Sequence, residues 1–394
     1  RMKIRFIVLA LVLATAIPAF AAGAEDWDGL KSDYTQLRKY MSSKRRIGPD
    51  ERTALSGLLE RLDVFIAANP DDRRALAMDI SVSTWLGRTE RVERDYEMLA
   101  QLTDSDAVWL AWAKMRLAEN RYDEAGAMAR SRPYDLAETP EIAIIDARSR
   151  MSRNEFQAAI DAIDAIPEAG LAKPGIRANA NRYRSMSQRW LALWEEESAA
   201  RAAEDAAGTA PVMQLITSRG PVTIMLFEEQ APNTVANFIE LSEQGFYNGT
   251  RFHRVEPNFV VQGGDPNSRP GTPGDPGTGG RGAQIPDEAG RDDKRLHFAG
   301  ALAMAKAPNP TVPGSSIPNT SSSQFYVVLE PTESLNKEYT VFGRVIDGME
   351  VLQRIRRDDE LTAVTTISRP EREYKATTML PPSVPPAGTK IDLP

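Results

Sequence analysis

Residues 252–265 read FHRVEPNFVVQGGD, and this stretch determines the fold expected for the second half of the chain. Its apolar run Phe259–Val261 is β-prone and stops at Gly263-Gly264, as a short strand does. Arg254 and Gln262 are eight residues apart on either side of that run. The stretch therefore predicts a short strand at Phe259–Val261, with Arg254 before it and Gln262 directly after it.

Short β-prone segments continue on both sides of this stretch. Pro232 is expected to open a helix that Gly245 ends, and a second short helix is expected after Gly348. Many short strands with two helices predict an antiparallel β-barrel capped by helices, not a parallel sheet. The expected strands are Val212–Ile216, Val222–Phe227, Phe259–Val261, Ala301–Ala305, Phe325–Leu329 and Thr340–Val345.

Further motifs accompany residues 252–265 in a fixed order, which is very improbable by chance. They are APNTVANF at 231–238, GFYNGT at 245–250, GTGG at 277–280, LAMA at 302–305, SQFY at 323–326 and VFGRV at 341–345. Together with residues 252–265, they resemble the cyclophilin-type peptidyl-prolyl cis-trans isomerases. The resemblance covers a domain at residues 212–373 and no other part of the chain.

The chemistry that this resemblance implies needs no covalent step. An X–Pro bond rotates slowly because rotation breaks amide resonance, with a barrier of ~18–20 kcal/mol. A protein lowers that barrier with an apolar socket for the proline ring and a cation that favours a pyramidal prolyl nitrogen. We therefore expect no cofactor. With no cysteine and two histidines in the chain, we expect no metal site either.

The resemblance also implies a role for individual residues. Arg254 is the catalytic guanidinium, and Gln262 orients both Arg254 and the substrate backbone. The remaining positions bind the proline-containing substrate: Phe259, Val260, Tyr326 and Leu335 form the proline socket, Tyr339 stands where many eukaryotic members have histidine, and Gly277, Ala305, Lys306, Ala307 and Gln324 line the groove for residues before the proline.

Some positions depart from the family pattern. Tyr326 replaces the commoner phenylalanine and adds a hydroxyl to an apolar wall, and Lys306 replaces the usual asparagine, where the role is largely that of the backbone. Residues 308–320 form a longer connection than usual at the edge of the groove. The resemblance implies that His253 is a structural, hydrogen-bonded histidine and not a catalytic one, whereas nothing in the sequence indicates a role for His297.

Residues 25–204 have a different character, rich in alanine, leucine, arginine and glutamate, and predict a helical domain. At an offset of 34 residues, Asn120 and Tyr122 match Asn154 and Phe156, and these segments resemble tetratricopeptide repeats. A stack of helical hairpins of no particular family explains the pattern equally well. In either case the predicted shape is an α-solenoid whose concave face could bind a protein partner. Residues 205–211 are expected to be a linker.

Both ends of the chain predict segments outside the folded domains. Lys3 and Arg5 precede an apolar run at 6–17 and small residues at 18–21, the pattern of a cleaved signal peptide at 1–21, with cleavage after Ala21 or, second, Ala24. The run is shorter than the ~20 residues of a membrane span, so we expect none after cleavage. The proline-rich tail 374–394 is expected to be disordered.

Composition narrows the possible partners and compartment. The formal net charge of −7 argues against nucleic-acid binding. An exported, acidic protein without cysteine fits a bacterial periplasm better than a eukaryotic extracellular space. We therefore expect a periplasmic isomerase that assists the folding of exported proteins. Two alternatives stay open: a proline-peptide-binding chaperone with little catalysis, and an envelope scaffold in which the helical domain is the main functional part.

Overall fold

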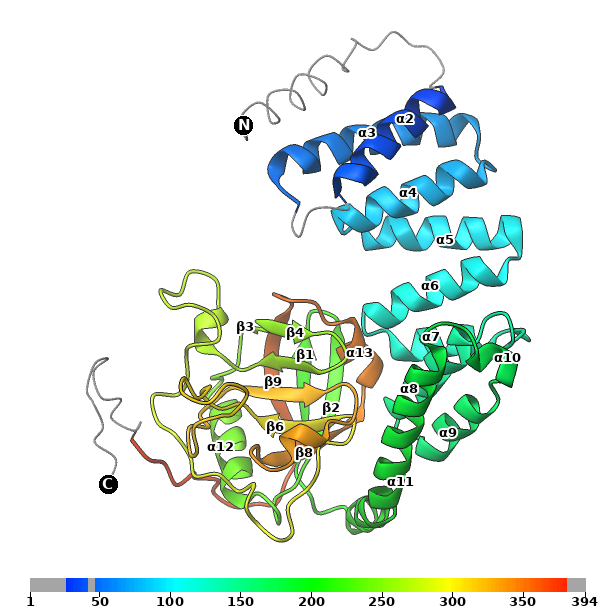
Figure 1. Ribbon diagram of the computed structural model, residues 1–394. Coiled ribbons are helices and arrows are strands. Elements are labelled where there is room, and N and C mark those ends of the chain that lie inside the picture. Colours follow the sequence, from blue (N-terminus) through cyan, green and yellow to red (C-terminus); the bar gives the residue numbers. More distant parts are fainter. Residues whose placement is uncertain (1–25, 42–46, 381–394) are drawn as a thin grey trace. The chain divides into compact units, whose positions relative to one another are not determined.

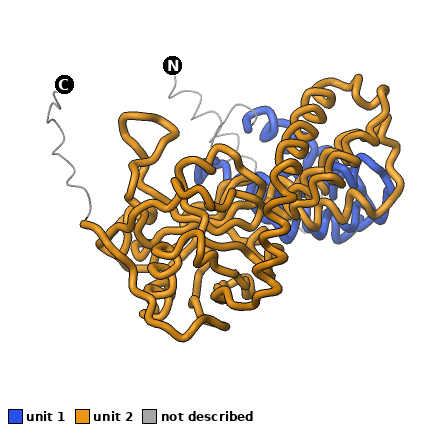
Figure 2. Tube along the Cα trace, turned by 90° about the horizontal axis from the view of Figure 1, so that it is seen from below, with its two compact units in different colours: residues 1–112 blue, residues 113–394 orange. Residues whose placement is uncertain are grey.

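The computed structural model describes residues 26–41 and 47–380 (Figure 1). The chain divides into two compact units between Trp112 and Ala113 (Figure 2). This boundary differs from the predicted one, because the second part of the helical region 25–204 belongs to the same unit as the sheet. The predicted signal peptide at 1–21 and residues 381–394 of the predicted tail lie outside the described residues.

The first unit consists of helical hairpins. Helix α4 shows how local sequence sets its ends: the Asp72 side chain accepts hydrogen bonds from the backbone N–H groups of Arg74 and Ala75, and Gly87 ends the helix in the left-handed conformation with φ 71°. The helices of this unit are α2 (Trp27–Met41), α3 (Pro49–Ala68), α4 (Arg73–Leu86) and α5 (Thr89–Thr103), while α6 (Asp106–Ala118) crosses the boundary.

Five of the helices in the second unit precede the sheet, and we call them the docked helices. Asn120 and Asn154, the pair found at the 34-residue offset, form the turns before α7 and α9 with φ of 66° and 60°. The helical character of the region is confirmed, whereas its assignment to the tetratricopeptide family stays a prediction. The docked helices are α7 (Tyr122–Arg130), α8 (Glu141–Met151), α9 (Phe156–Asp164), α10 (Glu168–Leu171) and α11 (Ile176–Ala207).

The rest of the second unit is a sheet domain of residues 212–380. Its strands form one antiparallel sheet in the order β3-β9-β1-β2-β8-β6-β7-β5-β4. The strands are β1 (Val212–Thr217), β2 (Gly220–Leu226), β3 (Thr250–Arg251), β4 (Arg254–Glu256), β5 (Val260–Gly263), β6 (Ala301–Met304), β7 (Phe325–Val328), β8 (Val341–Asp347) and β9 (Glu360–Ser368).

The sheet is strongly curled. Its two edge strands, β3 and β4, are separated in the chain only by Phe252 and His253, so the two edges must approach each other. Helices α12 (Pro232–Glu243) and α13 (Met349–Arg354) begin at the predicted places and pack on β9 and β2, respectively. The predicted fold class, a helical region followed by an antiparallel barrel-like sheet with helical caps, is confirmed.

Two boundaries differ from those expected. Helix α11 continues to Ala207, beyond the predicted end at 204 and into the predicted linker. At the other end, Tyr374 is buried and Met379 pairs with Gln284 in an isolated bridge. The sheet domain therefore extends past residue 373, and the described part of the predicted tail packs against it.

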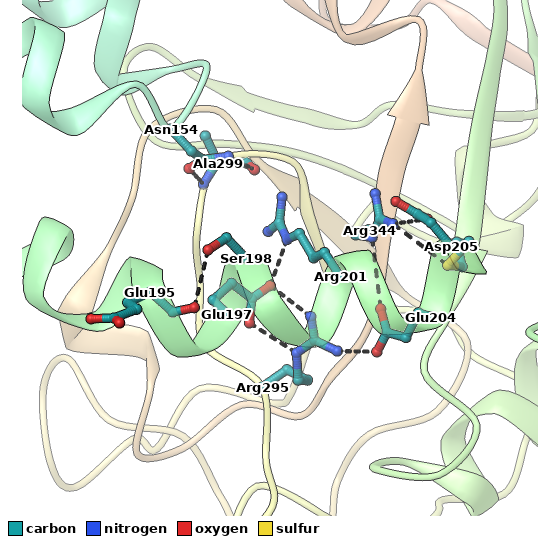
Figure 3. Close-up of polar contacts among 11 residues, drawn as sticks. Asn154, Glu195, Glu197, Ser198, Arg201, Glu204, Asp205, Arg295, Ala299 and Arg344 are labelled. Atoms are coloured by element: carbon teal, nitrogen blue, oxygen red, sulfur yellow. Dashed lines mark hydrogen bonds and ion pairs between the residues drawn. The ribbon is translucent and has the colours of Figure 1, made fainter. Parts of the chain in front are cut away.

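Paired charges join α11 to the sheet domain (Figure 3). Arg295 donates two hydrogen bonds to Glu197, at 2.9 and 2.7 Å, and one to Glu204, while its guanidinium lies 3.9 Å from the ring centroid of Phe227. The side chains of Arg295 and Glu197 are only 6% and 7% exposed. Arg344 makes a further ion pair with Asp205. Removing one partner of such a buried pair typically costs about 3–5 kcal/mol.

An aromatic contact lies beside these charges. Phe298, which is fully buried, has its ring centroid 4.7 Å from that of Trp190 and 5.2 Å from that of Trp194, both on α11. Phe156 at the start of α9 lies 6.1 Å from the same ring. Because Phe298 belongs to the hydrophobic core of the docked helices, the two parts of this unit share one core.

The two repeat asparagines complete the contact. Asn154 donates to the carbonyl oxygen of Ala299 and accepts from its N–H, both at 3.0 Å (Figure 3). Asn120 accepts from the N–H of Asn258 at 2.9 Å. The turns of two successive hairpins thus hold two loops of the sheet domain, so this part of the helical surface is occupied by the chain itself.

We expect Asn154→Gly to lower the free energy of unfolding of the second unit by about 2 kcal/mol, because the buried N–H and C=O of Ala299 lose their partners while glycine still accepts the positive φ. Urea unfolding followed by tryptophan emission measures the change. Asp358→Gly, at an exposed residue with φ 72°, is the matched control and should change stability little. Equal stability of Asn154→Gly and the wild type would show that these bonds contribute nothing.

Candidate functional site

Antiparallel register brings the predicted cation and amide together. Arg254 on β4 is directly opposite Gln262 on β5, and the Arg254 Nη1 to Gln262 Oε1 distance is 3.4 Å. Arg254 also contacts Glu256 at 3.3 Å, and its guanidinium carbon lies 5.8 Å from the ring centroid of Phe259. The Arg254 side chain is 47% exposed, so the cation is held beside an aromatic ring but remains accessible to a ligand.

A chain of amide hydrogen bonds extends from this pair to the glycine-rich loop. Gln262 donates to Gln324 at 3.0 Å, and Gln324 donates to the carbonyl oxygens of Gly277 and Gly279 at 3.0 and 2.9 Å. Gly277 has φ 97°, a conformation that favours glycine. The buried carboxylate of Asp265 accepts from the N–H groups of both glycines, which fixes the loop.

The predicted socket residues lie in one apolar cluster. Val260 and Tyr326 are buried in it, and their strands β5 and β7 are neighbours. Phe259, Leu335 and Tyr339 are half-buried at its edge, where a ligand can reach them, together with Ala305. The rings of Tyr326 and Tyr339 meet edge to face with centroids 5.9 Å apart. This surface provides a rigid apolar wall next to Arg254.

His297, for which the sequence indicated no role, supports the socket from behind. Its side chain is fully buried, with Nδ1 2.9 Å from Asn336 Oδ1 and Nε2 3.0 Å from the Tyr326 hydroxyl. Asn336 Oδ1 also accepts from the His297 backbone N–H, so Nδ1 must carry the ring proton. Nε2 is therefore an acceptor, and the Tyr326 hydroxyl donates to it. The socket receives the face of the Tyr326 ring and not its hydroxyl.

The groove positions after β6 are fixed by their own contacts. The Ala305 N–H donates to the Gln324 carbonyl at 2.9 Å, and the Ala307 N–H donates to the Thr320 hydroxyl at 3.0 Å. Lys306 differs from a groove-lining side chain, because it is 3% exposed and donates to Asp287 at 2.8 Å. Its ammonium group stabilises the scaffold and does not face a ligand.

The longer connection at 308–320 is pinned on both sides. Ser316 donates to the Glu338 carboxylate through its backbone and its hydroxyl, at 2.9 and 2.8 Å. The N–H of Asn319 donates to Asp287 at 2.9 Å, the carboxylate that also binds Lys306. Val312 within this connection is 50% exposed. The connection is thus tied to the residue preceding Tyr339 and stands beside the groove.

Sequence reasoning found the residues at the site surface but missed those behind it. Asn258 directly precedes Phe259 and has φ 63°. In the sequence it is only an asparagine in a turn, which does not indicate that it supports the site. No local signal could have found the role of His297, because its partners Asn336 and Tyr326 are 39 and 29 residues away in the chain. His253, expected to be structural, is buried, and burial lowers its pKa.

Within the described residues, no group of three or more His, Cys, Asp or Glu side chains is arranged to hold a metal ion. Among the same residues, no helix combines the length and the apolar composition needed to cross a bilayer.

The sheet domain is similar to known proteins. Residues 212–378 match the family model "Cyclophilin type peptidyl-prolyl cis-trans isomerase/CLD". A peptidyl-prolyl cis-trans isomerase from Synechococcus elongatus is 39% identical over 156 residues, which are 39% of this chain and 94% of that protein. The isomerase CYP18-2 from Arabidopsis thaliana is 41% identical over 148 residues, 38% of this chain and 82% of that protein. A crystal structure of a Cryptosporidium parvum cyclophilin-type isomerase in the presence of the dipeptide Ala-Pro is 30% identical, covers 40% of this chain and 99% of that chain, and has a TM-score of 0.33.

The buried histidine leads to a pH prediction. Burial lowers the pKa of His297 to about 4, against an ordinary value of 6.5. Below pH 6.5 the unfolded chain binds a proton that the folded chain does not, so stability falls as pH decreases towards 4, by up to about 3 kcal/mol. His297→Gln, which cannot titrate, should show a shallower loss between pH 7 and pH 4.5 in urea unfolding. Parallel curves for the two proteins would contradict the prediction, because the other titrating groups are common to both.

Proposed function

Since this chain belongs to the family of cyclophilin-type peptidyl-prolyl cis-trans isomerases, we propose that it accelerates X–Pro rotation in exported proteins and so assists their folding. The single observation that carries the catalytic part of the proposal is the position of Arg254. Its guanidinium lies at the rim of a buried apolar cluster, opposite Gln262 and beside Phe259.

The geometry accounts for the reaction without a covalent intermediate. The proline ring enters the cluster of Phe259, Val260 and Tyr326 and is held there while the preceding carbonyl rotates. As rotation breaks amide resonance, the lone pair returns to the prolyl nitrogen, and a guanidinium donor stabilises that pyramidal nitrogen more than the planar amide. Gln262 limits the positions that Arg254 can take, so little reorganisation is needed during rotation.

The proline-containing substrate is a polypeptide on this proposal. Backbone groups before the proline would pass along the glycine-rich loop, whose carbonyls at Gly277 and Gly279 are oriented by Gln324. On the other side of the groove, the connection at 308–320 is held by hydrogen bonds and limits the width that is available to the peptide. Both features favour an extended peptide segment over a folded surface.

We expect Arg254→Ala to lower kcat/KM by about a hundredfold or more, because the donor to the prolyl nitrogen is lost while the socket remains. Arg254→Lys should recover little, since an ammonium group lacks the planar fork of donors. Two-dimensional exchange NMR on an Ala-Pro peptide with the full chain measures the rate. Arg357→Ala, at an exposed arginine of the sheet domain, is the matched control.

The same measurement separates catalysis from binding. Unchanged exchange in Arg254→Ala would remove Arg254 from the mechanism. Peptide binding by the wild type without faster exchange would favour the proline-peptide-binding chaperone. The first comparison to make in that case is the wild type against a chain with residues 308–320 shortened, because the connection stands beside the groove.

We also propose that the chain is exported to a bacterial periplasm. The charged, apolar and small-residue order of residues 1–21 supports export, and the lack of cysteine is compatible with an oxidising compartment. Expression of the full chain in a Gram-negative host should yield a periplasmic protein that begins at Ala22. Intact mass and N-terminal sequencing after fractionation measure this, and a full-length cytoplasmic product would refute it.

A further inference from the structure

We infer that the docked helices are a positioning element of the isomerase site, which holds the proline socket from behind through two loops of the sheet domain. This inference rests on the proposed isomerase activity and extends it to residues of the helical region. The positioning residues are Phe298 and His297 on one route and Asn120 and Asn258 on the other.

The first route passes through one short loop. Phe298 is fixed in the aromatic core of the docked helices, and Asn154 holds the next residue, Ala299, at both its N–H and its C=O. His297 directly precedes Phe298, and its Nε2 accepts from the Tyr326 hydroxyl. A displacement of Phe298 therefore moves the acceptor that fixes the Tyr326 ring in the wall of the socket.

The second route reaches Phe259, which is half-buried at the edge of the same cluster. Asn258 immediately precedes Phe259, and its N–H is held by Asn120 in the turn before α7. Its side-chain carbonyl accepts from the Tyr122 hydroxyl at 3.1 Å and from Arg148. Arg148 is itself held by the buried carboxylate of Glu330, at 2.6 Å. The backbone that presents Phe259 is thus anchored in the docked helices.

Both routes act on the faces that must contact a proline ring. Tyr326 and Phe259 belong to one apolar cluster, and each is one hydrogen-bonded residue away from the docked helices. Misplacement of a binding surface by a fraction of an ångström weakens productive binding without changing the chemistry. A substitution that weakens a contact in either route should therefore raise the KM for the peptide more than it lowers kcat.

The kinetic test uses the full chain with Phe298→Leu, a milder change than alanine. We expect KM for an Ala-Ala-Pro peptide to rise about threefold to tenfold while kcat changes by less than about twofold. The control is Asp205→Ala, which removes the ion pair between α11 and Arg344 on β8, a docking contact outside both routes. An unchanged KM in Phe298→Leu, or an equal rise in Asp205→Ala, would overturn the inference.

A double-mutant cycle tests the route itself. Tyr326→Phe removes the hydroxyl that links the socket to His297, so Phe298→Leu should have a smaller effect on KM in that background than in the wild type. We expect a coupling of about threefold or more. Full additivity of the two changes would mean that Phe298 acts on overall stability only, and would contradict the first route.

Tryptophan emission offers a readout that does not depend on turnover. Trp190 and Trp194 contact Phe298, and the sheet domain contains no tryptophan. Saturation of the full chain with an acetylated Ala-Ala-Pro-Ala amide, which has no aromatic group, should change the emission. The change should be lost in Trp190→Phe/Trp194→Phe. No change in the wild type, or a full change in that variant, would count against the inference.

The proposed function and the inference fail in different ways. A wild type that binds the peptide but does not accelerate exchange refutes the function and leaves the emission experiment to decide the coupling. A wild type that accelerates exchange with the same KM as Phe298→Leu supports the function and refutes the inference. Asn120→Gly, which keeps the positive φ of its turn, tests the second route in the same assays.

Discussion

The burial of the Phe298 ring between α9, α11 and the sheet domain is the contact on which the second unit depends. Burying a phenylalanine side chain contributes about 1.5–3 kcal/mol, and this ring is fully buried. Its position also decides what its neighbours can do. Ala299 can reach Asn154, and His297 can reach Tyr326, only while Phe298 stays in the helical core. One apolar contact thus determines the geometry of two polar ones.

The charges around this contact have a different role. Arg295 and Glu197 are buried as a pair, as are Arg148 and Glu330. Desolvation offsets most of the attraction in such pairs, so they add little net stability over apolar residues. Misalignment would nevertheless leave a buried charge without its partner, which is costly. The apolar core therefore supplies the driving force for docking, while the ion pairs restrict it to one arrangement.

The parts of the fold set by local patterns could be predicted from the sequence. The strands around Val222, Val260 and Phe325 are rich in apolar, β-prone residues, and Pro232 and Gly245 delimit a helix by their backbone preferences. Strand β9 escaped prediction because it is rich in threonine and largely exposed. The docking contacts escaped for another reason. Asn154 and Ala299 are 145 residues apart, and an asparagine in a turn gives no sign of a partner at that distance.

The long-range contacts also explain how Tyr326, which adds a hydroxyl to the apolar wall of the predicted socket, is accommodated. A buried hydroxyl without a partner would cost about 1–3 kcal/mol, and near a proline ring it would also weaken apolar contact. In the structure the hydroxyl points to His297 Nε2, because Asn336 fixes the ring proton on Nδ1. The hydroxyl that tyrosine adds at position 326 thus has a hydrogen-bond partner in His297, and the loop that carries His297 is fixed by the docked helices. The hydroxyl by which Tyr326 departs from the family pattern is the group that connects the socket to the loop held by the docked helices.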